Sequence, residues 1–174
     1  MVKNNAKLIV LSDTHGNKES LELIRQAHPD ADCFIHCGDS ELRPEEMKDF
    51  ITVQGNSDIA GMYPFVRRIE VGKYRILVKH GHDLFGKFVF PKELARHTAD
   101  QKCNILLFGH SHEFCDEIIN GIHIINPGAV TRPVNGSASY AEVIIDRNGV
   151  DVIRHNYVLL GPRFGEDIRP IAVL

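Results

Sequence analysis

The stretch Lys-Leu-Ile-Val-Leu-Ser-Asp-Thr-His at residues 7–15 decides the fold that we expect. It opens with a short, mainly apolar run at residues 7–11, which predicts a buried strand. Asp13 and His15 follow directly, where the chain leaves that strand. Residues 18–27 then place leucine and isoleucine at helical spacing, so the opening unit reads as strand, loop and helix.

The rest of the chain continues this alternation and then turns to hairpins. We expect strands at 33–36, 51–54 and 105–108, a short helix opened by Pro44, a helix at 91–100, and hairpins formed by 66–71 with 74–79, 115–119 with 122–125, and 141–145 with 150–158. Mixed βα units followed by hairpins predict an α/β fold: a four-layer αββα sandwich of two mixed β-sheets flanked by helices. Residues 1–174 are expected to form a single domain.

Composition excludes several classes of function. The net charge is −3 and no stretch is densely basic, so bulk nucleic-acid binding is not expected. No window approaches the roughly 20 apolar residues of a membrane span, so we expect a cytoplasmic protein without a membrane partner. The four cysteines lie in or beside apolar runs and are interpreted as reduced thiols. The oligomeric state, a homo-oligomer included, is left open.

Residues that can bind metals fall just after the predicted strands. Five strands end in this way, and the residues that follow them are Asp13 and His15, Asp39, Asn56, His80 and His82, and His110 and His112. Ligands of α/β sheets gather at the carboxyl ends of strands, so side chains about a hundred positions apart can meet at one site. His28, His97, His123 and His155 fall outside these motifs and are interpreted as surface or packing residues, and His36, inside a predicted strand, is interpreted as a core histidine.

The residue types suit a pair of divalent cations. Imidazole, carboxylate and carboxamide groups match Mn²⁺, with Zn²⁺, Fe, Co²⁺ or Ni²⁺ as alternatives. Two carboxylates against two such cations leave an excess positive charge, which favours an anionic substrate. Two metals can acidify a water molecule and clamp the oxygens of an in-line displacement at phosphorus. Asp39 is the expected bridge between them.

The ordered motifs Asp13-x-His15, Gly38-Asp39, Gly55-Asn56-x-Asp58, His80-Gly81-His82 and Gly109-His110-x-His112 resemble those of the calcineurin-like metallophosphoesterases, and especially their small single-domain phosphodiesterase branch. The resemblance spans residues 7–128 and includes Asn126-Pro127-Gly128. It implies that one metal is held by Asp13, His15, Asp39 and His112, and the other by Asp39, Asn56, His80 and His110. It also implies hydrolysis of a small phosphodiester by a hydroxide that the dinuclear metal centre activates, with His80, His110 and Asp39 as catalytic residues.

One position departs from that family pattern. Many relatives have a histidine directly after the Gly-Asn pair, where this chain has Ser57. Serine is no ordinary general acid, so diesters with acidic leaving groups are expected to be better substrates than alkyl monoesters unless His82 or water supplies the proton. Asn56, Ser57 and Arg132 are the expected substrate contacts, with an exposed loop arginine outside the site as the alternative for Arg132. His82 is either this acid or a hydrogen-bond partner that orients a metal ligand. Asp58 is either a turn carboxylate or such an orienting partner.

Two other functions compete with catalysis. The same superfamily includes a retromer subunit that serves as an interaction surface, so a non-catalytic protein-interaction scaffold of the same fold is the main alternative. A metal store or sensor is the other, and it predicts tight metal binding without hydrolysis of a phosphate ester. The intact set of strand-end ligands favours the enzyme over the scaffold.

Overall fold

The central strand β1 (Ala6–Leu11) is buried on both faces. Leu8 and Val10 lie in the core between two sheets, whereas Ile9 and Leu11 lie in a separate core beneath α1 (Lys18–Ala27). Burial on both faces explains why the run is continuously apolar rather than alternating. The computed structural model describes residues 4–84, 91–134 and 136–157.

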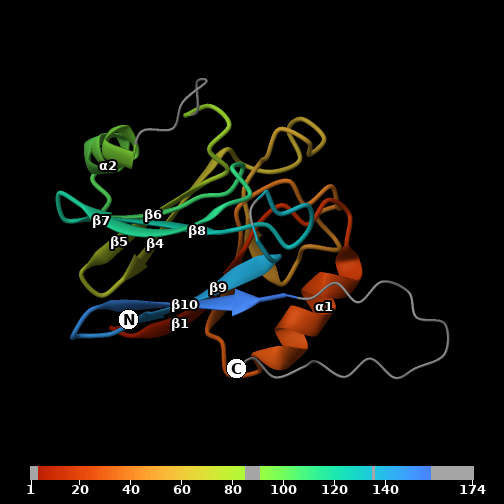
Figure 1. Ribbon diagram of the computed structural model, residues 1–174, viewed down its shortest axis with the longest axis horizontal. Coiled ribbons are helices and arrows are strands. Elements are labelled where there is room, and N and C mark those ends of the chain that lie inside the picture. The colour runs from red at the N-terminus through yellow and green to blue at the C-terminus, as the bar shows by residue number, and fades with distance from the viewer. Residues whose placement is uncertain (1–3, 85–90, 135, 158–174) are drawn as a thin grey trace.

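Two five-stranded mixed sheets pack face to face (Figure 1). The first has the order β10 (Val150–Asn156), β9 (Ser139–Ile145), β1, β2 (Cys33–His36) and β3 (Phe50–Thr52). The second has the order β4 (Val66–Val71), β5 (Tyr74–Lys79), β6 (Ile105–Leu107), β8 (Ile122–Pro127) and β7 (Phe114–Ile119).

Parallel pairing aligns the ends of the strands that matter for the site. In the first sheet β1 pairs in parallel with β2, and β2 with β3. In the second sheet β5 pairs in parallel with β6, and β6 with β8. The antiparallel strands β9 and β10 complete the first sheet, and the antiparallel strands β4 and β7 complete the second. The carboxyl ends of the parallel strands therefore lie at one edge of each sheet.

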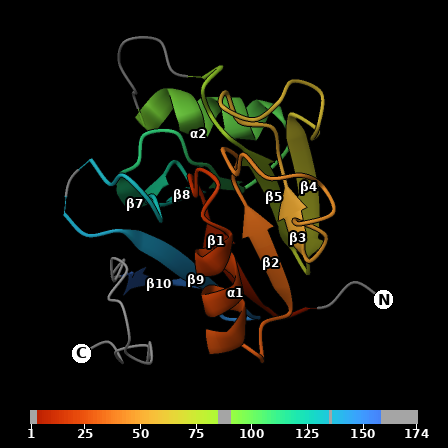
Figure 2. The same cartoon turned by 90° about the vertical axis from the view of Figure 1, so that its right-hand side faces the viewer.

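One helix covers the outer face of each sheet. Leu21 and Ile24 of α1 pack on the first sheet, along β1 and β2 (Figure 2). Leu94 and Ala95 of α2 (Pro91–Asp100) pack on the second sheet. These contacts confirm the predicted αββα order of layers. Neither helix among the described residues has the length and apolarity needed to cross a membrane.

The prediction of a short helix that begins at Pro44 is wrong. The backbone N–H of Met47 donates to the carbonyl groups of Arg43 and Pro44, each at 3.2 Å, and this closes a single turn. The Met47 side chain is buried in the core beneath α1. The chain then enters β3 at Phe50, so it has no room for further helical turns. Strand β3 also ends at Thr52 rather than at residue 54.

Candidate metal centre

Backbone hydrogen bonds join the loops that leave the two sheets. The N–H of Asp13 donates to Gly38 O and the N–H of His15 donates to Asp39 O, both at 3.1 Å, so the loops after β1 and β2 run side by side. The N–H of His110 donates to the Asp13 carboxylate at 3.2 Å, which ties the loop after β6 to them. Loops from both sheets thus meet at one place.

The seven sequence-predicted ligands come together there. Asp13, His15 and His112 each offer a ligand atom within 4.8 Å of the others, and Asp13, Asp39 and His80 form a second such group. The remaining two ligands adjoin this second group. Asn56 Oδ1 lies 3.1 Å from His80 Nε2, and the rings of His80 and His110 are 5.1 Å apart between centroids. In this geometry Asp13 belongs to both groups and Asp39 to one, whereas the resemblance assigned the shared position to Asp39.

Two buried ligand atoms lack hydrogen bonds among the described residues. They are Asp13 Oδ1 and His15 Nε2. Asp13 Oδ1 lies 3.1 Å from His112 Nε2, an ion-pair contact without hydrogen-bond geometry. His15 Nε2 has no such contact among the described residues, and a buried polar atom without a partner costs about 1–3 kcal/mol. A divalent cation between these side chains would remove that cost, so the donor set fits a metal.

Five of the ligands adopt left-handed backbone conformations. Their φ angles lie between 45° and 67°, and they are Asp13, His15, Asp39, His110 and His112. Such conformations cost roughly 1–3 kcal/mol each for non-glycine residues and persist only where surrounding contacts impose them. The sharp turns at these positions aim successive side chains into one volume, which is typical of a functional site.

The glycines beside the ligands are required by close packing. A Cβ on Gly55 would collide with the backbone nitrogen and Oδ1 of Asp39, and one on Gly109 would collide with the Ser12 hydroxyl. Gly38 has a φ of +97°, and a Cβ there would lie 2.7 Å from His80 Nδ1. The Gly-Asp, Gly-Asn and Gly-His motifs therefore let three loops approach one another.

Three histidines are oriented by acceptors on their Nδ1 atoms. The Nδ1–H of His80 donates to Cys37 O and that of His112 donates to Arg132 O, both at 2.8 Å. The Nδ1–H of His15 donates to a carboxylate oxygen of Glu41 at 2.7 Å. Because these oxygens can only accept, each Nε2 keeps its lone pair for a metal. Sequence reasoning missed Glu41, whose one signal was an acidic side chain two residues after Asp39.

Asp58 clamps the loops that carry the second group of ligands. One carboxylate oxygen accepts from the N–H groups of Asp39 at 2.9 Å and Gly55 at 2.8 Å. The other accepts from the Ser40 hydroxyl at 3.1 Å and the Glu41 N–H at 2.7 Å. Asp58 thus acts on the backbone around Asp39. No contact with His80, one of the roles considered from the sequence, is among its hydrogen bonds.

The charged groups of the site stabilise one another. Burial raises the pKa of Asp39, but contact with His80 and hydrogen bonds from Ser57 outweigh it and hold that pKa well below its usual range. Burial likewise opposes protonation of His80, yet its contact with Asp39 leaves the His80 pKa raised. Contact with Asp13 raises the pKa of His112. Positive charge is therefore favoured at this place, as expected where cations bind.

The other predicted residues take more peripheral places. The His82 ring lies 5.5 Å from that of His80 and 6.2 Å from that of His110, and its buried Nδ1 has no hydrogen bond among the described residues. Arg132 is exposed and contributes its carbonyl oxygen to His112. His36 is fully buried, its pKa is lowered to about 4 by burial, and it bonds to Thr14, which confirms a core histidine.

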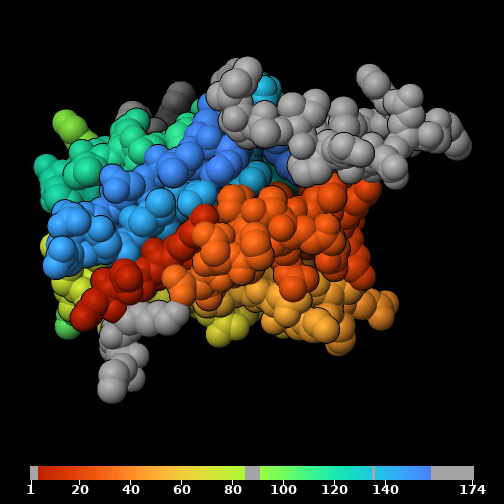
Figure 3. Space-filling model, turned by 90° about the horizontal axis from the view of Figure 1, so that it is seen from below, coloured from red at the N-terminus to blue at the C-terminus, as the bar shows by residue number. Residues whose placement is uncertain are grey.

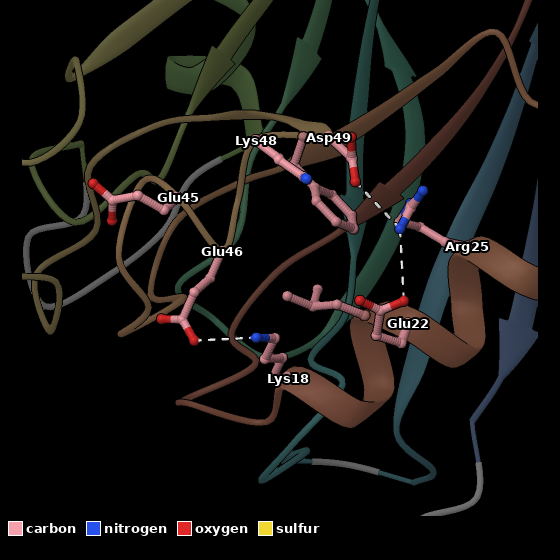
Figure 4. Close-up of a pocket in the computed structure, with 9 residues that line it drawn as sticks. Lys18, Glu22, Arg25, Glu45, Glu46, Lys48 and Asp49 are labelled. Carbon is pink, nitrogen blue, oxygen red and sulfur yellow. Dashed lines mark hydrogen bonds and ion pairs between the residues drawn. The ribbon is translucent and has the colours of Figure 1, made fainter.

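A hollow of about 190 Å³ lies apart from these residues, between α1 and residues 45–50 (Figure 4). Four of its charged side chains form ion pairs: Lys18 with Glu46 at 3.4 Å, and Arg25 with Asp49 at 3.2 Å. None of the seven ligands lines it. This hollow is therefore separate from the candidate metal centre.

Comparisons with known proteins agree with the site. Residues 7–148 match the calcineurin-like phosphoesterase superfamily domain. A probable metallophosphoesterase of Bacillus subtilis is 34% identical, over 83% of this chain and 88% of that protein. A Streptococcus pneumoniae structure described as a predicted phosphoesterase has a TM-score of 0.78 at 30% identity, over 90% of this chain and 94% of that one. A solved archaeal phosphodiesterase shares the fold, with a TM-score of 0.66 at 20% identity over 86% and 99% of the two chains.

Proposed function

Because the chain belongs to the calcineurin-like phosphoesterase superfamily, we propose that it is a metal-dependent phosphodiesterase that hydrolyses a small phosphodiester. The observation that carries this proposal is the meeting of five strand ends around two buried atoms, Asp13 Oδ1 and His15 Nε2, that lack hydrogen bonds. A scaffold would have no need to maintain five left-handed ligands at one place.

The ligands divide between two cation positions. Asp13, His15 and His112 surround one position, and Asp39, Asn56, His80 and His110 surround the other, with a carboxylate of Asp39 or Asp13 between them. We propose Mn²⁺ as the native ion. When bound, the two cations would supply Lewis acidity, making water a nucleophile near neutral pH and neutralising charge on the phosphate.

The protein's own side chains hold the two cation positions and determine which substrate can approach them. Asn56 and Ser57 are exposed, so the second position opens to solvent and to a substrate. His80 and His110 flank it, with ring centroids 5.1 Å apart, and would act on the developing charge of the phosphate through the cation that they hold. Arg132 is exposed and lies beside His112, whose Nδ1–H donates to the Arg132 carbonyl oxygen. We propose that the Arg132 side chain reaches the outer phosphate oxygen.

Preference for diesters follows from Ser57. Its hydroxyl donates to Asp39 and is therefore no free acid for a leaving group. His82, whose ring is 6.2 Å from that of His110, is the imidazole that we propose for leaving groups that need a proton. Leaving groups that depart without a proton fit this site best. The archaeal structure with the same fold is itself described as a phosphodiesterase.

Metal-stimulated hydrolysis tests the proposal. Protein stripped with EDTA and reloaded with Mn²⁺ is assayed on bis-p-nitrophenyl phosphate and on p-nitrophenyl phosphate. We expect turnover of the diester to exceed that of the monoester, and Asp39→Asn to lower it by about 100-fold or more. His123→Ala is the matched control, because His123 bonds to Asp116 away from the site.

Each other result rejects a defined part of the proposal. Absence of metal-stimulated turnover on either ester would favour the interaction scaffold. Tight Mn²⁺ binding without hydrolysis would favour a metal store or sensor. A monoester rate above the diester rate would refute the argument from Ser57 while leaving the phosphoesterase in place.

A further inference from the structure

A second group of metal-competent side chains lies on the outer face of the first sheet. His28 ends α1, Glu142 lies on β9 and His155 lies on β10. One ligand atom from each lies within 4.8 Å of the others. Figure 3 shows this face of the molecule, with the blue residues of β9 and β10 beside the orange residues of α1. The group shares no residue with the candidate centre described above.

The register of the sheet brings the group together. Ile153 pairs with Glu142 and His155 pairs with Tyr140, so Glu142, Tyr140 and His155 project from the same face. The end of α1 adds His28 to that face. The side chains of His28 and Glu142 are 8% and 10% exposed, whereas that of His155 is 19% exposed, which leaves a way in from solvent.

Glu142 is within hydrogen-bonding distance of one histidine of this group but not of the other. His155 Nε2 lies 3.0 Å from Glu142 Oε2, but His28 Nδ1 lies 3.9 Å from the same oxygen. A separation of 3.9 Å is too long for a hydrogen bond. Ligand atoms around a tetrahedral ion with bonds of about 2.0–2.1 Å lie about 3.3 Å apart, between these two distances. Small rotations of two imidazoles would place all three atoms around one ion.

Neighbouring aromatic and hydroxyl groups hold the imidazoles in place. The Tyr140 hydroxyl lies 2.9 Å from His28 Nε2, so Nδ1 is the nitrogen that faces Glu142. The Tyr140 ring stacks on that of His155, with centroids 4.8 Å apart and planes inclined by 6°. Metal-binding histidines are typically fixed in this way by a partner on the other ring nitrogen or by packing.

The local charge also permits a cation. Lys7 Nζ lies 2.9 Å from Glu142 Oε1 and 3.1 Å from Asp30. The ammonium group therefore occupies one oxygen of Glu142 and leaves Oε2 to the histidines. The charges of Lys7, Asp30 and Glu142 sum to −1. The surroundings are therefore negative, which favours a divalent cation.

We propose that His28, Glu142 and His155 bind one transition-metal ion of the Zn²⁺ type. Two imidazoles and one carboxylate form a donor set that suits Zn²⁺, Co²⁺ or Ni²⁺. Three protein ligands leave the fourth tetrahedral position to water. An ion here joins the end of α1 to the edge of the sheet at β10.

Counting bound metal tests this site separately from the paired centre. Asp39→Asn serves as the starting protein, because its paired centre is disabled under the proposed function. We expect Asp39→Asn/His155→Ala to bind one equivalent of Zn²⁺ less in equilibrium dialysis, and to lose the visible absorption that reports tetrahedral Co²⁺. Asp39→Asn/His123→Ala is the control, and it should bind as much as Asp39→Asn.

Equal metal content in Asp39→Asn and Asp39→Asn/His155→Ala would overturn the proposal. The comparison holds whether or not Asp39→Asn disables the paired centre, so failure of the proposed function would not mimic failure here. Glu142→Gln supplies a second variant that keeps the size of the side chain. It should lose the same equivalent, and circular dichroism checks that each variant remains folded.

Discussion

Ser57 donates two hydrogen bonds to Asp39, one from its hydroxyl to Oδ2 at 2.9 Å and one from its backbone N–H to Oδ1 at 2.8 Å. Both oxygens of the expected bridging carboxylate are thereby oriented by one residue. In the position where many relatives carry a histidine, this chain has a group that positions a metal ligand.

Removing the Ser57 hydroxyl should therefore weaken metal binding. We expect Ser57→Ala to lower Mn²⁺ affinity by about 10- to 100-fold, the usual effect of losing a group that orients a metal ligand. Ser57→Thr should restore most of the affinity because it keeps the hydroxyl. Isothermal titration calorimetry measures both, with the exposed Ser137→Ala as control. Unchanged affinity in Ser57→Ala would show that the backbone N–H alone orients Asp39.

Loss of the Asp58 carboxylate should destabilise the metal-free protein. Asp58 accepts four hydrogen bonds and is 7% exposed, so Asp58→Ala leaves buried donors without a partner. We expect the free energy of unfolding to fall by about 2–3 kcal/mol in urea titrations with EDTA. Asp58→Asn should also destabilise the protein, because its NH₂ group can only donate and would face two hydrogen-bond donors. The exposed Asp151→Asn is the control, and equal loss in both asparagine variants would contradict the clamp.

A methyl group at Gly55 should disrupt the site. It would collide with Asp39, whereas nothing lies within 4 Å of a Cβ placed on Gly149. We expect Gly55→Ala to lower the free energy of unfolding by about 1–3 kcal/mol and to abolish Mn²⁺ binding at micromolar concentrations. Gly149→Ala should change stability by less than about 0.5 kcal/mol. Similar behaviour of the two variants would mean that the loops do not approach as closely as described.

Metal affinity should fall as the pH is lowered. The pKa values of His80 and His112 are raised above 6.5, because Asp39 outweighs the burial of the first and Asp13 contacts the second. A metal needs neutral imidazoles, so protons compete already above pH 6.5, by about tenfold per pH unit for each imidazole that must lose a proton. Calorimetric titrations across this range measure the slope. Affinity independent of pH would contradict the assignment.

The same two pKa shifts act in the opposite sense on the metal-free protein. A histidine with a raised pKa in the folded state stabilises the fold below its unfolded pKa of 6.5, and this contribution is lost as the pH rises through the folded value. With EDTA present, the contribution of these two histidines to stability should therefore decline above pH 6.5. Replacing His112 with alanine should reduce that dependence.

Local patterns in the sequence predicted the sheets and the meeting of the ligands. Residues 8–11 are apolar because both faces of β1 are buried, and Gly72-Lys73 joins β4 to β5 as expected of a tight turn. The strand-end positions of Asp13 and Asp39 in the first sheet, and of His80 and His110 in the second, were sufficient to predict the proximity within each pair, because parallel strands align their ends.

Contacts between distant segments could not be predicted in the same way. Glu41 meets His15 across 26 residues, and Asp58 meets Asp39 across 19. Neither spacing has a local pattern, since each pairing depends on how two loops leave neighbouring strands. The turn after Pro44 was mistaken for a helix because burial of Met47, a tertiary contact, directs the chain into β3.

Anomalous diffraction from crystals grown with Mn²⁺ tests the central claim most directly. We expect two peaks about 3.5–4 Å apart, one among Asp13, His15 and His112 and the other among Asp39, Asn56, His80 and His110. A single peak, or peaks away from these side chains, would contradict a paired-cation centre at the strand ends.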